Sequence, residues 1–192
     1  MTAEPKPGSR SARVRAAVLK AAGELLMAGG LTAATVDAIN ARSGVSKATI
    51  YKHWPNRTCV AIDAFAEHMA RTVPLPDTGS ARGDLTEQLR LVCAFHASPA
   101  GAVFAQLLAG ATADPQAGRL LRERFLAGRR EAIRVLWRRA LARGEVRAEV
   151  DVEVAIDLLF GPVIYRLVSG VAPIGPEQAG AIAEAALAGL GR

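Results

Sequence analysis

The stretch "GVSKATIYKHWPN", residues 44–56, combines a glycine corner with a helix of about two turns. Ile50 and Trp54 are its large apolar side chains, and on a helical wheel they lie on one side together with Ser46. The opposite side and its flanks carry polar or small side chains: Lys47, Ala48, Thr49, Tyr51, Lys52 and His53. Because so short a helix is unstable alone in water, we predict that Ile50 and Trp54 anchor it and leave the polar side for a partner.

The residues just before this stretch predict the helix that anchors it. Thr35 is a good N-cap for a helix that ends at Ser43-Gly44, and Ser46 caps the following helix, which must finish before Pro55. Gly44 can adopt the positive φ that a short corner needs. Two short helices joined in this way indicate a helix-turn-helix, whose second helix enters the DNA major groove.

Each outward side chain suits a contact with DNA. Lys47 can donate to guanine or to a phosphate, Thr49 can contact a base edge or a thymine methyl, and Ala48 permits close approach. Donors to phosphate oxygens are expected in Tyr51, Lys52 and His53. At Thr35 and Ser46 the helix N-termini offer backbone N–H groups that attract phosphate.

The distribution of charge supports a polyanionic partner. Residues 1–57 hold nine Lys or Arg and three Asp or Glu, whereas residues 58–192 hold fifteen of each sign, so the net charge of +6 lies in the first third of the chain. Such a localised basic segment is typical of nucleic-acid binding, although a basic stretch alone can be solvated surface.

The remaining sequence is rich in Ala, Leu, Arg and Glu, and it predicts an all-α fold of about nine helices. We expect a disordered arm over 1–10, a three-helix DNA-binding domain over 11–56 and a connecting helix over 57–72. A Pro- and Gly-containing connection at 73–83 then begins a helical domain over 73–192. Further helices are expected at about 84–97, 100–112, 115–143, 151–170 and 176–190.

Several other classes of protein are disfavoured. Residues 91–113 are uncharged and long enough to span a bilayer, but Pro99-Ala100-Gly101 interrupts them, which favours two packed helices and no membrane partner. Cys59 and Cys93 form neither a disulfide framework nor a zinc pattern, and we interpret them as buried thiols of a cytoplasmic protein rather than redox sensors. No paired carboxylates, nucleophile–base pair or phosphate loop stands out, so we predict no catalytic residue, cofactor or metal.

From about residue 11 to 68 the sequence resembles the TetR family of bacterial transcriptional regulators. The likeness rests on an amphipathic first helix ending in "GG" and on "LTAATVDAINARSGVSKATIYKHWPNR", residues 31–57. Trp54 stands where the family commonly has Phe, and "TCV" follows Arg57 in place of the usual acidic and aliphatic residues. Carried over position by position, the resemblance implies that Arg57 joins the DNA-contacting residues named above.

The resemblance also implies a homodimer that binds a palindromic operator as a repressor and leaves it when a small-molecule effector binds. The stretch "DLLFGPVIYRLVSG", residues 157–170, resembles the helix that pairs with its counterpart across a dimer. Its apolar face gives the expected interface: Leu158, Leu159, Ile164 and Leu167. Side chains expected to line an effector pocket are Phe65, His68, Phe95, His96, Phe104, Gln106 and Trp137; the scarcity of charge over 84–112 indicates a largely apolar effector.

Alternatives remain for each of these readings. The apolar face of 157–170 and the pocket residues could be ordinary core, and His68 with His96 could bind a metal only if a third ligand joined them. Two other functions also remain: a helix-turn-helix protein that binds DNA without an effector, and a helical enzyme acting on a small molecule.

Overall fold

A computed structural model describes residues 9–190. Within that range the chain is helical almost throughout, and it forms nine helices if α7, η1 and α8 are counted as one continuous helix. The predicted all-α fold is confirmed. The arm predicted over residues 1–10 lies outside the described residues except for Ser9, which caps the first helix, and Arg10, which begins it.

The described chain divides into two compact units, which are considered separately. The first holds residues up to Met69 together with Ala102–Phe125, and the second holds Ala70–Gly101 together with the residues from Leu126 onward. The segment 102–125 thus groups with the N-terminal helices, whereas one domain was predicted over 73–192. Sequence order alone does not reveal this return of the chain.

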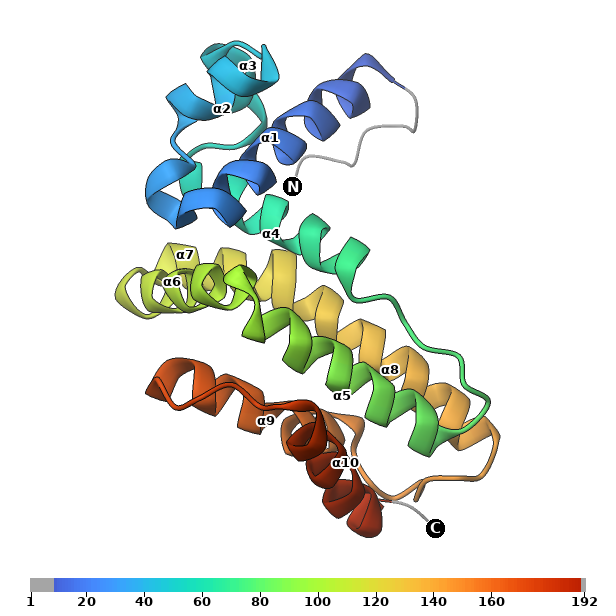
Figure 1. The fold of residues 1–192 in the computed structure, drawn as a ribbon. Helices are drawn as coiled ribbons and strands as arrows, with labels where there is room; N and C mark the ends of the chain where they lie inside the picture. Colours follow the sequence, from blue (N-terminus) through green and yellow to red (C-terminus); the bar gives the residue numbers. More distant parts are fainter. Residues whose placement is uncertain (1–8, 191–192) are drawn as a thin grey trace. The chain divides into compact units, whose positions relative to one another are not determined.

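The first unit begins with α1 (Arg10–Ala33), α2 (Val36–Ser43), α3 (Lys47–His53) and α4 (Arg57–Thr72) (Figure 1). The backbone of α1 is non-helical at Gly29 and Gly30, as the expected stop at "GG" requires. The first unit also contains α6 (Pro99–Ala113) from residue 102 on, α7 (Pro115–Leu121) and η1 (Arg122–Leu126) up to Phe125. The segment η1 is a π-helical turn, and the chain passes through it from α7 into α8 without a non-helical residue.

An aromatic cluster forms part of the core of the first unit. Phe65 of α4, Phe104 of α6 and Phe125 of η1 are buried, and their ring centroids lie 5.1–5.5 Å apart. Rings at these separations pack favourably beyond the apolar area that they bury. The cluster therefore holds α4, α6 and η1 together.

In the second unit α5 (Ala81–Ala97) contacts α8 (Ala127–Ala142), α9 (Val152–Ser169) and α10 (Pro176–Leu190). Asp84 of α5 is fully buried, and its carboxylate accepts hydrogen bonds from Thr78 and from Arg143, the C-cap residue of α8. Burial opposes ionisation of this carboxyl, but these hydrogen bonds outweigh it and lower the pKa of Asp84. The pair ties the beginning of α5 to the end of α8.

The uncharged run 91–113 is split into two helices. Ser98 is extended between the end of α5 and the start of α6, and Gly101 follows it closely. A Cβ atom at Gly101 would lie 1.9 Å from the backbone oxygen of His96, so the corner accommodates no side chain there. By length and composition, α1 is the single helix within 9–190 that is long and apolar enough to cross a membrane, with a third of its most apolar window buried, and α5 and α6 pass only when joined across their bend.

Candidate nucleic-acid interface

The helix-turn-helix has the local structure that its sequence predicts. The Oγ1 atom of Thr35 accepts a hydrogen bond from the N–H of Ala38, and Ser46 Oγ accepts one from the N–H of Thr49. Gly44 between the helices has a φ of 70° and donates its N–H to Asn40. These contacts fix the corner that sets the direction of α3.

The short helix α3 is anchored by its two apolar side chains. Ile50 and Trp54 are completely buried. The wheel was wrong about Ser46, which it placed on the inward side with them: Ser46 is exposed, because a capping residue lies outside the helix and turns its hydroxyl back onto the first turn.

The other side of α3 faces solvent. Exposed positions are Lys47, Ala48, Tyr51 and Lys52, with Arg57 exposed at the start of α4, while Thr49 and His53 are half-buried. Lys47 forms an ion pair with Asp37 of α2, and the hydrogen bond in that pair raises the pKa of the lysine. In the free protein the first cation of α3 therefore already has an acidic partner.

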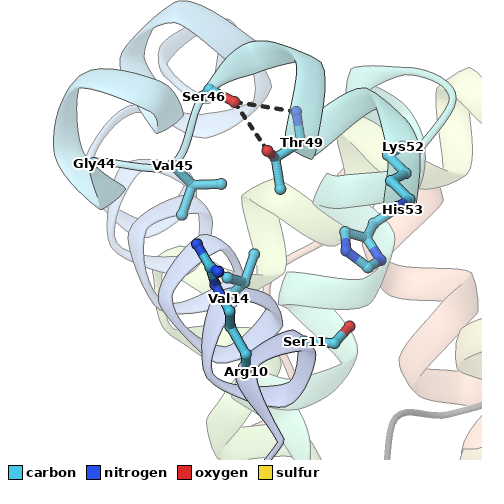
Figure 2. A pocket seen from close by; sticks show the side chains of 9 residues that line it. All are labelled: Arg10, Ser11, Val14, Gly44, Val45, Ser46, Thr49, Lys52 and His53. Carbon is cyan, nitrogen blue, oxygen red and sulfur yellow. Dashed lines mark hydrogen bonds between the residues drawn. The ribbon is translucent and has the colours of Figure 1, made fainter.

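A groove of about 690 Å³ lies between α3 and the beginning of α1. Figure 2 shows Thr49 and His53 on one side of it and Ser11 and Arg10 on the other. The hydroxyl groups of Thr49 and Ser46 also lie 2.9 Å apart, and this hydrogen bond holds the rotamer of Thr49. Arg10 and Ser11 were not predicted to contribute, because they lie some forty residues from the motif and carry no pattern of their own.

The residues predicted to line a pocket are divided between the two units. In the first unit Phe65 and Phe104 belong to the aromatic cluster, and the Gln106 side chain accepts a hydrogen bond from the N–H of Leu31 at 2.9 Å. These contacts give the three side chains packing or capping partners within the chain itself. His68, also in this unit, is half-buried on α4.

In the second unit Phe95, His96 and Trp137 are buried. Burial lowers the pKa of His96 to about 4, with a smaller contribution from the positive charge of Arg129, so the imidazole is neutral at pH 7. Among residues 9–190, no three His, Cys, Asp or Glu side chains come together as metal ligands would. Both cysteines are buried thiols, and burial raises the pKa of Cys93 to about 11.

The expected dimer residues on α9 differ in exposure. Leu158 is exposed, Ile164 and Leu167 are half-buried, and Leu159 is completely buried. Leu159 therefore belongs to the core of its own unit and not to an interface, because adjacent residues of a helix point about 100° apart. The large apolar side chains that α9 exposes form a stripe of Val154, Leu158, Tyr165 and Val168, of which only Leu158 was predicted to lie at the interface.

Comparison with known proteins places these features in a family. Residues 18–61 match "Bacterial regulatory proteins, tetR family", and residues 75–186 match "Tetracyclin repressor-like, C-terminal domain". The HTH-type transcriptional regulator YdeS of Bacillus subtilis is 39% identical over 151 residues, which are 79% of this chain and 76% of YdeS. A regulator of the same type from Mycobacterium tuberculosis, Rv1556, is 31% identical over 85% of this chain and 79% of its own length.

Solved structures agree with the sequence matches. The crystal structure of the TetR family transcription regulator SCO0332 superposes with a TM-score of 0.87 at 35% identity, covering 92% of this chain and 98% of the other. The flavonoid-responsive regulator FrrA, at 24% identity and a TM-score of 0.63 over 92% of this chain and 94% of its own, shares the fold. A helix-turn-helix with a polar outward face, followed by a matching C-terminal helical domain, thus shows that the chain belongs to the TetR family of DNA-binding transcriptional regulators and is not an enzyme.

Proposed function

We propose that the chain is a cytoplasmic, homodimeric repressor that binds a palindromic operator and leaves it when a small molecule binds. The observation that carries the DNA-binding part is the polarity of α3. Its apolar side chains, Ile50 and Trp54, are fully buried. Its remaining side chains offer hydrogen-bond donors to the DNA major groove and to the DNA phosphates. A two-turn helix held in this way is rigid enough to read bases.

The roles on α3 follow from position and chemistry. Lys47 and Thr49 lie in the first turn, where a recognition helix meets base edges, and Ala48 between them allows the backbone to approach. Tyr51, Lys52, His53 and Arg57 lie later and are placed to donate to phosphates. Arg10 and Ser11 extend this surface from α1 across the groove.

Dimerisation is supported by the exposed apolar stripe of α9. Val154, Leu158, Tyr165 and Val168 recur at helical spacing, and each is at least half exposed in the single chain. A stripe of this kind is stabilised when a second copy covers it. Two heads held roughly 34–36 Å apart would match two half-sites one turn of DNA apart.

Release requires that the effector have a higher affinity for the conformation of the protein that cannot bind the operator than for the conformation that can. The absence of charged side chains over residues 91–113 favours a largely apolar effector. Regulation without an effector is the second candidate, and one observation favours it: Phe65, Phe104 and Gln106 already have partners within the first unit.

The decisive experiment is selection and sequencing of DNA fragments retained by the purified protein. We expect a palindrome, and we expect Thr49→Ala or Lys47→Ala to weaken binding to it about tenfold while helicity and dimer mass stay unchanged. Lys52→Ala should weaken binding on all sequences alike and make the salt dependence shallower by about one unit. Unaltered binding by all three variants would refute the assignment of α3.

A further inference from the structure

A buried carboxylate joins the recognition helix to three other segments. Asp63 lies on α4, and its side chain is 7% exposed. Its Oδ2 atom accepts hydrogen bonds from Trp54 Nε1 at 2.8 Å, Arg124 Nη1 at 3.0 Å and Arg15 Nη2 at 3.1 Å. The donors come from the end of α3, from η1 and from α1, all within the first unit.

The bond to Trp54 fixes the C-terminal end of α3. Trp54 is the C-cap of that helix, with its backbone N–H bonded to Ile50 and its ring fully buried. An indole has a single N–H donor with one direction, so the bond to Asp63 orients the ring as well as holding it. Arg15 lies over the same ring, 5.4 Å from the centroid. A phenylalanine at this position, the residue common in the family, would lack the donor.

Arg124 brings the π-helical turn into this contact. The next residue, Phe125, packs against Phe65, with 5.2 Å between the ring centroids. The segment η1 therefore contacts α4 at both Asp63 and Phe65. Turns of this kind often occur at functional sites. The chain runs from η1 directly into α8. Because Arg124 belongs to η1 and Asp63 to α4, a shift of η1 against α4 moves Arg124 relative to Asp63.

We propose that Asp63 is a positioning residue for α3, and that Arg124 sets how firmly Asp63 holds Trp54. A buried carboxylate is stable only with enough donors and positive charge around it. When Arg124 withdraws, Arg15 and water take its place around Oδ2, the Trp54 bond loosens, and the angle of α3 is less well defined. DNA affinity then depends on a residue that does not touch DNA. This inference rests on the proposed role of α3 as the DNA-reading helix.

The principal test compares two arginines of the same turn. Arg124→Gln removes the ion pair to Asp63, while Arg122→Gln removes an equal charge from an exposed side chain two residues earlier. Each variant is titrated with the selected operator at several salt concentrations. We expect Arg124→Gln to weaken binding about three- to thirtyfold with the wild-type salt slope, and Arg122→Gln to match the wild-type protein.

Two other outcomes would overturn the proposal. A salt slope shallower by about one unit for Arg124→Gln would mean that this guanidinium neutralises a phosphate directly. An affinity equal to that of Arg122→Gln would mean that the ion pair serves stability alone. Circular dichroism and dimer mass are measured on the same samples, so loss of folded protein is not mistaken for loss of affinity.

The sign of the Asp63→Asn effect gives a second test. Removing a negative charge near DNA strengthens binding if charge alone matters, whereas loss of positioning weakens it. We expect weaker binding. Trp54→Phe should weaken binding as well, and in that background Arg124→Gln should add little, because its effect passes through Trp54. Additive losses in the double variant would contradict the proposed route.

Fluorescence reports on the same contact without DNA. The chain has two tryptophans, so Trp137→Phe leaves Trp54 as the one emitter. Arg124→Gln in this background should shift the emission of Trp54, while Arg122→Gln should not. The α3 variants separate the two hypotheses. If Thr49→Ala, Lys47→Ala and Lys52→Ala all leave binding intact, the role of α3 fails, whereas the positioning proposal fails alone if these variants weaken binding and Arg124→Gln does not.

Discussion

The helices α3 and α9 expose opposite chemistries. The exposed residues of α3 are Lys47, Ala48, Tyr51 and Lys52, whereas the exposed stripe of α9 is Val154, Leu158, Tyr165 and Val168. Both helices bury an apolar side in their own unit. The difference lies in what each leaves outside, donors and charge in one case and aliphatic and aromatic carbon in the other. The exposed side therefore indicates the partner: a polyanion for α3 and a second apolar surface for α9.

The largest effect should come from placing a charge on the stripe of α9. Leu158→Glu would bury carboxylates in the proposed interface, twice per dimer, and we expect monomers and a loss of operator affinity of at least about a hundredfold. Leu141→Glu on α8 is the matched control, because that leucine is also exposed but lies outside the stripe. Light scattering and operator titration measure both. A dimer that survived Leu158→Glu would place the interface elsewhere.

Acid should lower the stability of the second unit, because this unit contains His96. Its folded pKa of about 4 lies below the unfolded value of about 6.5. The unfolded chain therefore binds a proton first, so this contribution to stability is complete above pH 6.5 and falls as the pH drops toward 4. We expect a loss of about 3 kcal/mol at pH 4. Urea titrations of the wild-type protein and His96→Gln between pH 4 and 7 measure it; parallel pH profiles would show that His96 has no such role.

A smaller effect, confined to the first unit, should follow from changing the corner before α3. Gly44 has a positive φ and nothing within 4 Å of the position of a Cβ atom, so an alanine there meets only backbone strain. Gly44→Ala should lower the free energy of unfolding by about 1 kcal/mol. Gly44→Asn, which tolerates this conformation better, should lower it less. Equal losses in the two variants would show that the corner does not depend on its left-handed backbone.

The smallest effect should come from freeing Lys47. Asp37→Asn removes the acidic partner that Lys47 has in the free protein. Surface pairs contribute up to about 1 kcal/mol, so we expect affinity for any duplex to rise two- to fivefold at low salt, with the gain disappearing at high salt. An unchanged affinity at low salt would mean that Asp37 does not compete with DNA for this lysine.

Much of the first unit follows from local sequence. Thr35, Gly44, Ser46 and Pro55 each specify one turn or cap through their own backbone preferences, and burial of Ile50 and Trp54 follows from helical periodicity. The helix predicted over 115–143 is also present, although its π-helical turn was not foreseen. An extra residue within a helix leaves no clear mark on apolar spacing.

Contacts between distant segments could not be predicted. Asp63, Arg15 and Arg124 are ordinary charges in the sequence, and only the packing of α1, α4 and η1 brings them to one oxygen atom. Leu159 was assigned to an interface because α9 is apolar on nearly all sides, which hides the side that faces the core. Gln106 was assigned to a pocket, but its amide caps the backbone after the "GG" break in α1.

Gly101 has a consequence for how the newly made chain folds. The atom that blocks a side chain there belongs to the backbone of His96, so no rotamer change can relieve the clash. Any larger residue at position 101 would prevent the chain from bending between α5 and α6. The 23 uncharged residues 91–113 would then stay exposed as the polypeptide leaves the ribosome. Such a run attracts chaperones, other chains and the membrane. Substitutions at Gly101 should therefore reveal themselves as insoluble protein before any change in gene control can be measured.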